Sequence, residues 1–385
     1  MSTKRDLTPA KGPGIKQSIL ETIKPFTQLT PDPVSSSLNK LPLIKSPVNH
    51  LPKRNLINSL AKSTQASSSE DLKKEKLTLP KPNQLTPRLT KSSRNPANIV
   101  TRVAFKSRVG SILGKPKVHN QDSFIIKPSL QGLRGQYMFA VCDGHGAYGH
   151  HVSQYVRDLF PSFLEEFLDH DLSSLTIEKS FHQAITKLNK GLLETGIEIA
   201  FSGTTLNCVT IFGSLCVCAN IGDSRAVLGK LNQGIWDYAE LSQDHNTKRY
   251  DERMRILGSN GRIAQDKNDE GNYDGPERVW LMDDDIPGLA MTRSIGDKIS
   301  KIVGVTSDPE VLIKRLNCDD KFIVIASDGV WENIDSKEAV MIISGYYQEG
   351  KFEEAAGALA MEAAKRWDKD DYVDDITVVV IFLSA

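Results

Sequence analysis

Aromatic side chains are confined almost entirely to one part of the chain. Of its 13 Phe, 9 Tyr and 4 Trp residues, only Phe26 precedes residue 98, whereas 12 of the 18 prolines do. A segment without aromatic side chains buries too little apolar surface to offset the entropy lost on ordering its backbone, so residues 1–97 are predicted to form a disordered extension. Residues 98–385 are long enough to build one substantial core, and we expect a single domain there.

Charge divides the chain at the same place. Residues 1–97 hold 17 Lys+Arg and 6 Asp+Glu, a net of +11, and residues 98–385 hold 31 and 42, a net of −11. The neutral total of 48 against 48 therefore excludes a uniformly basic nucleic-acid binder, and no nucleic-acid partner is expected. The basic extension carries four Ser/Thr-Pro pairs and a basic-then-apolar run at 73–79. We favour a solvated extension, with a kinase or regulatory partner that docks on it as the alternative.

Targeting signals and cysteines indicate the compartment. The first 20 residues lack the apolar core of a signal peptide, Ser2 stands where N-myristoylation needs Gly, and no apolar run approaches the roughly 20 residues of a bilayer span. No membrane association is expected. The cysteines are odd in number and lack the spacing of a zinc site, so we predict buried thiols and a cytoplasmic or nuclear location. They are Cys142, Cys208, Cys216, Cys218 and Cys318.

Hydrophobic periodicity predicts the order of elements. Apolar runs typical of strands lie at 137–142, 205–212, 215–221, 225–229, 322–327 and 376–383. Helical periodicity appears at 152–167, 176–195, 336–346 and 350–367, with a kink or restart expected at Pro161. The polar segment 245–290 predicts an irregular lobe. Strands and helices come in blocks, which favours an α+β fold with largely antiparallel sheets.

Aspartates recur where the apolar runs end. Asp143, Asp223 and Asp328 follow such runs, and Asp374 precedes one. Strand ends are rigid, so carboxylates placed there can converge, and their mutual repulsion would be relieved by divalent cations. Hard oxygen ligands favour Mg²⁺ or Mn²⁺ over zinc. For any one Asp-Gly pair an ordinary turn remains the alternative, and spacing alone does not decide between the two.

At these residues the chain resembles the metal-dependent (type 2C, PPM) Ser/Thr protein phosphatase family. The resemblance covers about residues 101–385 and involves a whole ordered series of motifs. They are KVHNQD at 117–122, DGHG at 143–146, SGTT at 202–205 with ANIGDSR at 219–225, DH at 244–245 with GRI at 261–263, PGLAMTRSIGD at 287–297, ASDGVWE at 326–332 and DDITV at 374–378.

The resemblance implies a sandwich of two antiparallel β-sheets flanked by helices, and hydrolysis of phosphoserine and phosphothreonine in phosphorylated proteins. It also implies two Mg²⁺ or Mn²⁺ ions, with a third, weaker one. Asp143 would bridge two ions and the Gly144 carbonyl would bind one of them. Asp328 and Asp374 would hold the other ion and Asp122 would bind through water. Asp223, together with Asp328, would hold the third.

The same resemblance implies a mechanism and a monomer. A metal-bridged hydroxide would attack phosphorus in line, and His145 would protonate the leaving oxygen as general acid. Lys117 stands where the family often has a phosphate-binding Arg, Gln121 where it often has Glu, and Asp375 where Asn is common. Because a lysine is a point charge, we expect Lys117 to bind phosphate with looser orientation.

Two other functions stay open at this point. A pseudophosphatase could bind a partner through the same fold, although intact Asp143, Asp328 and Asp374 favour an active enzyme. A phosphatase of this fold could also act on a non-protein substrate, since the lobe at 245–290 would control access to the site.

Overall fold

A computed structural model describes residues 99–169, 172–267, 273–367 and 372–384. The chain divides into two compact units, Met1–Thr86 and Pro87–Ala385, and all described residues belong to the second. The predicted extension, residues 1–97, lies outside the described residues.

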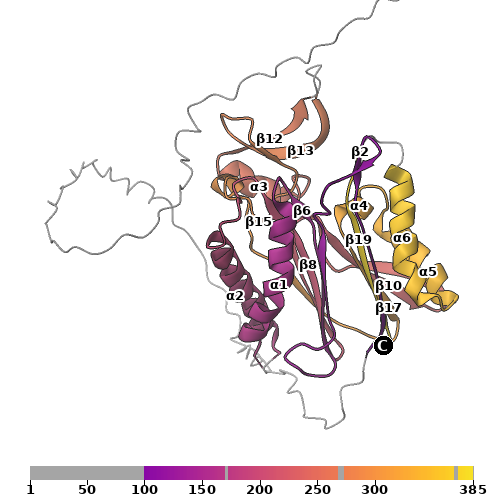
Figure 1. The fold of residues 1–385 in the computed structure, drawn as a ribbon. Coiled ribbons are helices and arrows are strands. Elements are labelled where there is room, and N and C mark those ends of the chain that lie inside the picture. The colour runs from indigo at the N-terminus through magenta and orange to yellow at the C-terminus, as the bar shows by residue number, and fades with distance from the viewer. Residues whose placement is uncertain (1–98, 170–171, 268–272, 368–371, 385) are drawn as a thin grey trace, which may run out of the picture. The chain divides into compact units, whose positions relative to one another are not determined.

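Two five-stranded antiparallel sheets form the centre of the domain (Figure 1). The first sheet has the order β1 (Val100–Arg108), β19 (Ile376–Leu383), β17 (Asp320–Ala326), β10 (Arg225–Asn232) and β11 (Ile235–Glu240). The second has the order β16 (Glu310–Arg315), β9 (Leu215–Ile221), β8 (Leu206–Phe212), β5 (Gln136–Cys142) and β4 (Ser123–Lys127).

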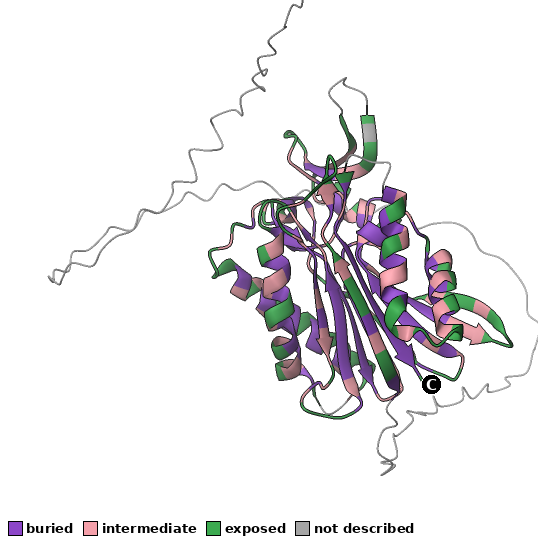
Figure 2. Cartoon of the chain, turned by 45° about the vertical axis from the view of Figure 1, so that its right-hand side comes forward, coloured by how far each residue is buried: buried purple, intermediate pink, exposed green. Residues whose placement is uncertain are grey.

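Helices cover the outer face of each sheet, as Figures 1 and 2 show. The second sheet packs against α1 (Gly149–Phe167) and α2 (Ser174–Leu193), and the first against α4 (Asp328–Trp331), α5 (Ser336–Gln348) and α6 (Phe352–Trp367). Side-chain oxygens of Ser173 and Asp335 cap the first turns of α2 and α5 by accepting backbone N–H bonds. The predicted α+β sandwich flanked by helices is confirmed.

Strand alternation explains why the sheets are buried on both faces. In β19, Val378, Val380 and Phe382 pack under the helices of the first sheet, whereas Val379 and Ile381 pack between the two sheets. Successive side chains of a strand point to opposite faces, so a continuous apolar run serves a strand that is covered on both sides. These runs were the strongest strand signals in the sequence for that reason.

The segment 245–290 contains regular elements in its described residues, 245–267 and 273–290, so the prediction of an irregular lobe is wrong there. It contains α3 (Tyr250–Gly258) and a three-stranded sheet of β12 (Gly261–Lys267), β13 (Tyr273–Leu281) and β14 (Pro287–Leu289). A small core of its own holds it together, including Ile256, Val279 and Leu289. Its strands carry many exposed polar residues, and this composition hid them from a reading based on apolar runs.

Short strands line the end of the sandwich. They are β2 (Ser111–Ile112), β3 (Lys115–Pro116), β6 (Gly144–His145), β7 (Gly203–Thr204), β15 (Ile295–Gly296) and β18 (Tyr372–Val373), and the 3-10 helix Ser300–Val303 lies nearby in sequence.

Three smaller expectations can be compared with the structure. Helix α1 continues through Pro161 as one element, so no restart occurs there. Four cysteines are buried as predicted, but Cys318 is exposed, because it lies in the turn between β16 and β17 rather than in a strand. In the described part of the chain, no helix has the length and apolar character needed to cross a membrane.

Candidate metal centre

The predicted aspartates come from both sheets. Asp143 follows β5, Asp223 follows β9 and Asp122 precedes β4, all in the second sheet. Asp328 begins α4 directly after β17, and Asp374 lies between β18 and β19 of the first sheet. Acidic side chains therefore stand at strand ends in both layers of the sandwich.

The pKa values of these carboxyls show how close together they lie. Burial raises the pKa of Asp143 and of Asp328 well above the ordinary value. The charge of Asp328 raises that of Asp143 further, and the charges of Asp223 and Asp374 raise that of Asp328. Burial, followed by nearby carboxylates, raises the pKa of Asp122 and of Asp223 to about 7. The charged forms of these groups thus lack sufficient positive compensation from the protein itself.

Three carboxylate oxygens of the metal-ligand candidates lack a hydrogen-bond partner within the described residues. They are the Oδ1 atoms of Asp122, Asp223 and Asp328, and each is shielded from solvent. A buried, unpartnered carboxylate oxygen is costly unless a cation or a hydrogen-bond donor meets it. Oxygen donors with this charge fit Mg²⁺ or Mn²⁺.

The side chains are not yet arranged as a finished ion site. Across the described ranges, no group of three or more His, Cys, Asp or Glu side chains surrounds one point in a way that could hold a metal ion. One reason is visible at Asp374, which is engaged by a lysine. The fit to a metal therefore rests on donor type, burial and charge.

Lys117 is that lysine. Its Nζ lies 2.5 Å from Asp374 Oδ1 and 2.9 Å from the hydroxyl oxygen of Tyr372. Burial lowers the pKa of Lys117, but the charge of Asp374 and the hydrogen bonds to Asp374 and Tyr372 together outweigh burial and leave the pKa raised. The structure thus places the expected phosphate-binding cation against a metal-ligand candidate. Tyr372 was missed by the sequence reading, because nothing in its local pattern marks it.

Gly144 sits where only glycine fits. A Cβ at this position would lie 2.5 Å from the carbonyl oxygens of both Gln121 and Gly149. Gln121 donates from Nε2 to Gly146 O at 2.7 Å, and so ties the first motif to the DGHG loop. Asp375 accepts backbone N–H bonds from Gly110 and from Gln121, at 2.6 and 2.8 Å. Both departures from the family pattern therefore hold backbone near the aspartates.

His145 forms a short ion pair that the sequence reading did not foresee. Its Nε2 lies 2.6 Å from Oδ2 of the buried Asp297, whereas its Nδ1 has no hydrogen-bond partner among the described residues. Burial lowers the pKa of His145, but the charge and hydrogen bond of Asp297, with the charge of Asp223, together outweigh burial and leave the pKa raised. Asp297 closes the matched motif at 287–297, which was the only available signal.

Hydroxyl groups hold the aspartates in position. Thr205 Oγ1 accepts the backbone N–H of Asp143 at 2.9 Å and bonds to Ser224 Oγ at 2.7 Å. Ser327 Oγ donates to Asp122 Oδ2 at 2.8 Å and joins the two sheets at that point. These buried contacts leave the ligand candidates little freedom to move.

A cleft of about 660 Å³ opens beside the aspartates. Two of the metal-ligand candidates, Asp223 and Asp328, line the cleft together with residues of the lobe. The lining includes Asp223, Asp328, Arg225, Asp244, Lys248 and Gln265.

The chain is similar in sequence to a known protein family and to individual members of it. Residues 113–372 match the family described as protein phosphatase 2C. A probable protein phosphatase 2C 35 from Arabidopsis thaliana is 32% identical over 291 residues, which cover 71% of this chain and 82% of that protein. A probable protein phosphatase 2C 73 from Oryza sativa subsp. japonica is 35% identical over 301 residues, 69% of each chain.

A solved structure shares the fold. The serine-threonine phosphatase 2C from Toxoplasma gondii superposes with a TM-score of 0.63 at 21% sequence identity, and covers 74% of this chain and 97% of its own.

Proposed function

The chain belongs to the protein phosphatase 2C family and is a metal-dependent protein serine/threonine phosphatase, and from this premise we propose how its own residues carry out the hydrolysis. The observation that carries the proposal is the group of close, buried aspartates whose pKa values are raised by burial and mutual repulsion. Such a group is costly without cations and is matched to them in donor type.

Six groups of the protein would hold the metal ions. Two ions would bind tightly and a third ion weakly. Mg²⁺ or Mn²⁺, when bound, supplies activation of water and neutralises charge on the phosphoryl oxygens. Asp143 and Asp328 would take the central positions, because burial and nearby carboxylates raise the pKa of each well above its ordinary value. The full set is Asp143, the Gly144 carbonyl, Asp328, Asp374, Asp122 and Asp223.

His145 supplies the proton to the leaving group. When the bond between phosphorus and the serine or threonine oxygen breaks, that oxygen needs a proton. Asp297 binds Nε2 at 2.6 Å and favours the protonated ring, which leaves Nδ1–H as the acidic proton. Asp297 is thus a positioning residue for the general acid.

Lys117 has two partners in turn. It neutralises Asp374 in the structure as described. In the loaded enzyme it would share its charge with a phosphoryl oxygen of the substrate. Its single ammonium group orients phosphate less strictly than the two-pronged guanidinium of an arginine.

Phosphate release tests the proposal. Full-length protein is incubated with a phosphothreonine peptide while Mn²⁺ is titrated from zero, with EDTA as the reference. We expect release that rises with Mn²⁺ and saturates. The absence of metal-dependent release at micromolar enzyme would overturn the mechanism. A small phosphorylated metabolite tested in parallel distinguishes a protein substrate from a non-protein one.

Substrates and partners need a cellular measurement. Phosphoproteomics on cells that carry Asp143→Ala in place of the natural chain should show which phosphoserine and phosphothreonine sites accumulate. A kinase or regulatory partner of the +11 extension remains a proposal. Deleting residues 1–97 should abolish its capture without changing peptide hydrolysis at moderate salt.

A further inference from the structure

A buried histidine grips the turn that carries Asp223. His245 is fully buried, and its backbone N–H donates to Gly222 O at 3.0 Å while its ring Nδ1 accepts the Gly222 N–H at 3.1 Å. Gly222 has a φ of +104°, and a Cβ there would lie 2.6 Å from Thr205 Cγ2. Both polar groups of this strained glycine are therefore bound by one residue.

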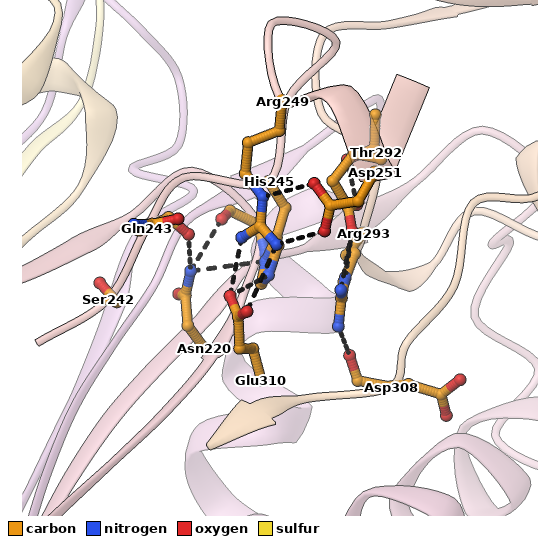
Figure 3. Close-up of polar contacts among 12 residues, drawn as sticks. Asn220, Ser242, Gln243, His245, Arg249, Asp251, Thr292, Arg293, Asp308 and Glu310 are labelled. Atoms are coloured by element: carbon orange, nitrogen blue, oxygen red, sulfur yellow. Dashed lines mark hydrogen bonds and ion pairs between the residues drawn. The ribbon is translucent and has the colours of Figure 1, made fainter. Parts of the chain in front are cut away.

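The contacts determine which ring nitrogen carries the proton. A backbone N–H can only donate, so Nδ1 of His245 must be the bare, accepting nitrogen. The proton then sits on Nε2, which donates to Glu310 Oε2 at 3.2 Å. Burial lowers the pKa of His245, in agreement with a neutral ring. Figure 3 shows this ring between Asn220 and Glu310.

Further residues hold the far side of the ring. Arg249, directly before α3, donates from Nη1 to Glu310 Oε2 at 2.7 Å and pairs with Asp251 at 2.6 Å. Asn220 Nδ2 donates to Gly222 O at 3.1 Å and to Gln243 O at 2.9 Å (Figure 3). The ring is thus fixed from the lobe side by ion pairs and from the sheet side by an amide.

We infer that His245 is a positioning residue that sets the conformation of the Gly222–Asp223 turn, and thereby the placement of Asp223 for a metal ion. The inference rests on the proposed role of Asp223. The path to the ligands is short, because Ser224 Oγ bonds to Thr205 Oγ1, which accepts the Asp143 N–H. Outer contacts of this kind orient the groups that bind a metal.

Two substitutions distinguish the contact that Nδ1 of His245 makes with Gly222 from the contact that Nε2 makes with Glu310. In His245→Asn, the amide oxygen stands near the position of Nδ1 and can accept from Gly222, but contact with Glu310 is lost. In His245→Gln, the longer side chain can reach Glu310 and leaves Gly222 without its ring acceptor. Each variant loses one buried hydrogen bond, so each is the other's control for stability.

Mn²⁺ binding is the measurement. Titration calorimetry on the full-length chain, together with the Mn²⁺ concentration for half-maximal phosphate release, should show weaker binding by about tenfold in His245→Gln. His245→Asn should stay within about threefold of the natural protein, and thermal unfolding in EDTA should fall similarly in both. Equal changes in Mn²⁺ binding for the two variants would overturn the inference.

The variant Asp223→Asn distinguishes a failure of the role inferred for His245 from a failure of the metal-binding role proposed for Asp223. If this variant binds Mn²⁺ as the natural protein does, the metal role of Asp223 fails, and the inference fails with it. If Asp223→Asn weakens binding but His245→Gln does not, only the inference fails.

A spectroscopic signature keeps the test independent of variant folding. Long-range ¹⁵N–¹H spectra of imidazoles in the natural protein should contain a neutral ring protonated at Nε2 and bare at Nδ1, absent in His245→Asn. The opposite tautomer, or a charged ring at neutral pH, would overturn the inference.

Discussion

Two groups of buried acid side chains in this domain have opposite fates. Glu252 of α3 is fully buried, and it accepts hydrogen bonds from Arg255, Arg293 and Thr292, which outweigh burial and hold its pKa well below the ordinary value. Asp143 and Asp328 have other aspartates as their main charged neighbours, and their pKa values are raised.

The difference separates structure from function. A buried carboxylate compensated by its own chain joins elements together, here α3 and the segment that contains Thr292 and Arg293. Buried carboxylates that the chain leaves uncompensated have a charge that something else must balance. Arg293 contributes to compensation of the first kind, because its Nε and Nη2 donate to Glu252 Oε1.

The largest effect is expected at the uncompensated group. Asp143→Asn should reduce metal-dependent phosphate release by at least about 1000-fold, because it removes the central ligand. Thermal unfolding in EDTA should be unchanged or higher, because a repelling charge is gone. The same substitution at the exposed Asp158 of α1 is the control and should leave activity intact. A destabilised, still active Asp143→Asn protein would erase the distinction between the two groups.

Substitution of the compensated carboxylate, Glu252, should change the stability of the fold. Glu252→Gln leaves Arg255 and Arg293 without their shared anion, and we expect the free energy of unfolding to fall by about 3 kcal/mol. Urea unfolding measures it, with Glu349→Gln on the surface as the matched control. Unchanged stability together with lost Mn²⁺ dependence would show that Glu252 serves the metal site.

Stability of the metal-free protein should depend on pH in a direction that the raised pKa values determine. Asp122 and Asp223 have an ordinary pKa of 3.8 and a folded pKa of about 7, so the folded state binds more protons between these values. The free energy of unfolding in EDTA therefore falls as pH rises through this window, by about 2 kcal/mol for each of the two groups between roughly pH 5.5 and 7.5, and levels off above it.

Excess Mn²⁺ should remove this decline, because bound cations favour the charged carboxylates. Glu252 acts with the opposite sign, since its lowered pKa makes its stabilisation disappear only in acid. Calorimetric melting across pH checks both. A metal-free protein that becomes more stable from about pH 5.5 to 7.5 would contradict the expected repulsion.

The smallest effect is expected at the His145–Asp297 pair, in which a buried carboxylate is compensated by a functional side chain. Asp297→Asn should lower kcat by about tenfold, since the outer partner of a functional histidine is lost. The pKa of His145 should drop, so the alkaline fall of activity should begin at lower pH. The control is Asp308→Asn, the same substitution at an exposed aspartate. A uniform loss of activity with an unmoved pH profile would contradict the assigned role.

Much of the fold and of the candidate site could be predicted from the sequence where a feature depends on one strand alone. Continuous apolar runs fixed β5, β8, β9, β17 and β19, and the aspartates at their ends were found because strand ends are visible in sequence. The lobe was misjudged, because the strands β12 and β13 are half-exposed and lack such runs.

Partners distant in sequence could not be found in this way. Asp297 lies 152 residues from His145, and Glu310 lies 65 from His245. Neither pairing leaves a trace in local periodicity, because antiparallel packing decides which loops meet. Lys117 was identified as a cation of the site, but its contact with Asp374 depends on the short strands β2, β3 and β18 coming together.

The aspartates are divided between two layers, and this division has a mechanical consequence. Asp143 is anchored to one sheet and Asp328 and Asp374 to the other, so any ion held among them fastens the two halves of the sandwich at their open end. The apolar side chains between the sheets are non-directional and resist sliding only weakly. Ions bound there would therefore fix the position of one sheet against the other, and catalysis and the cohesion of the sandwich would depend on the same few bonds.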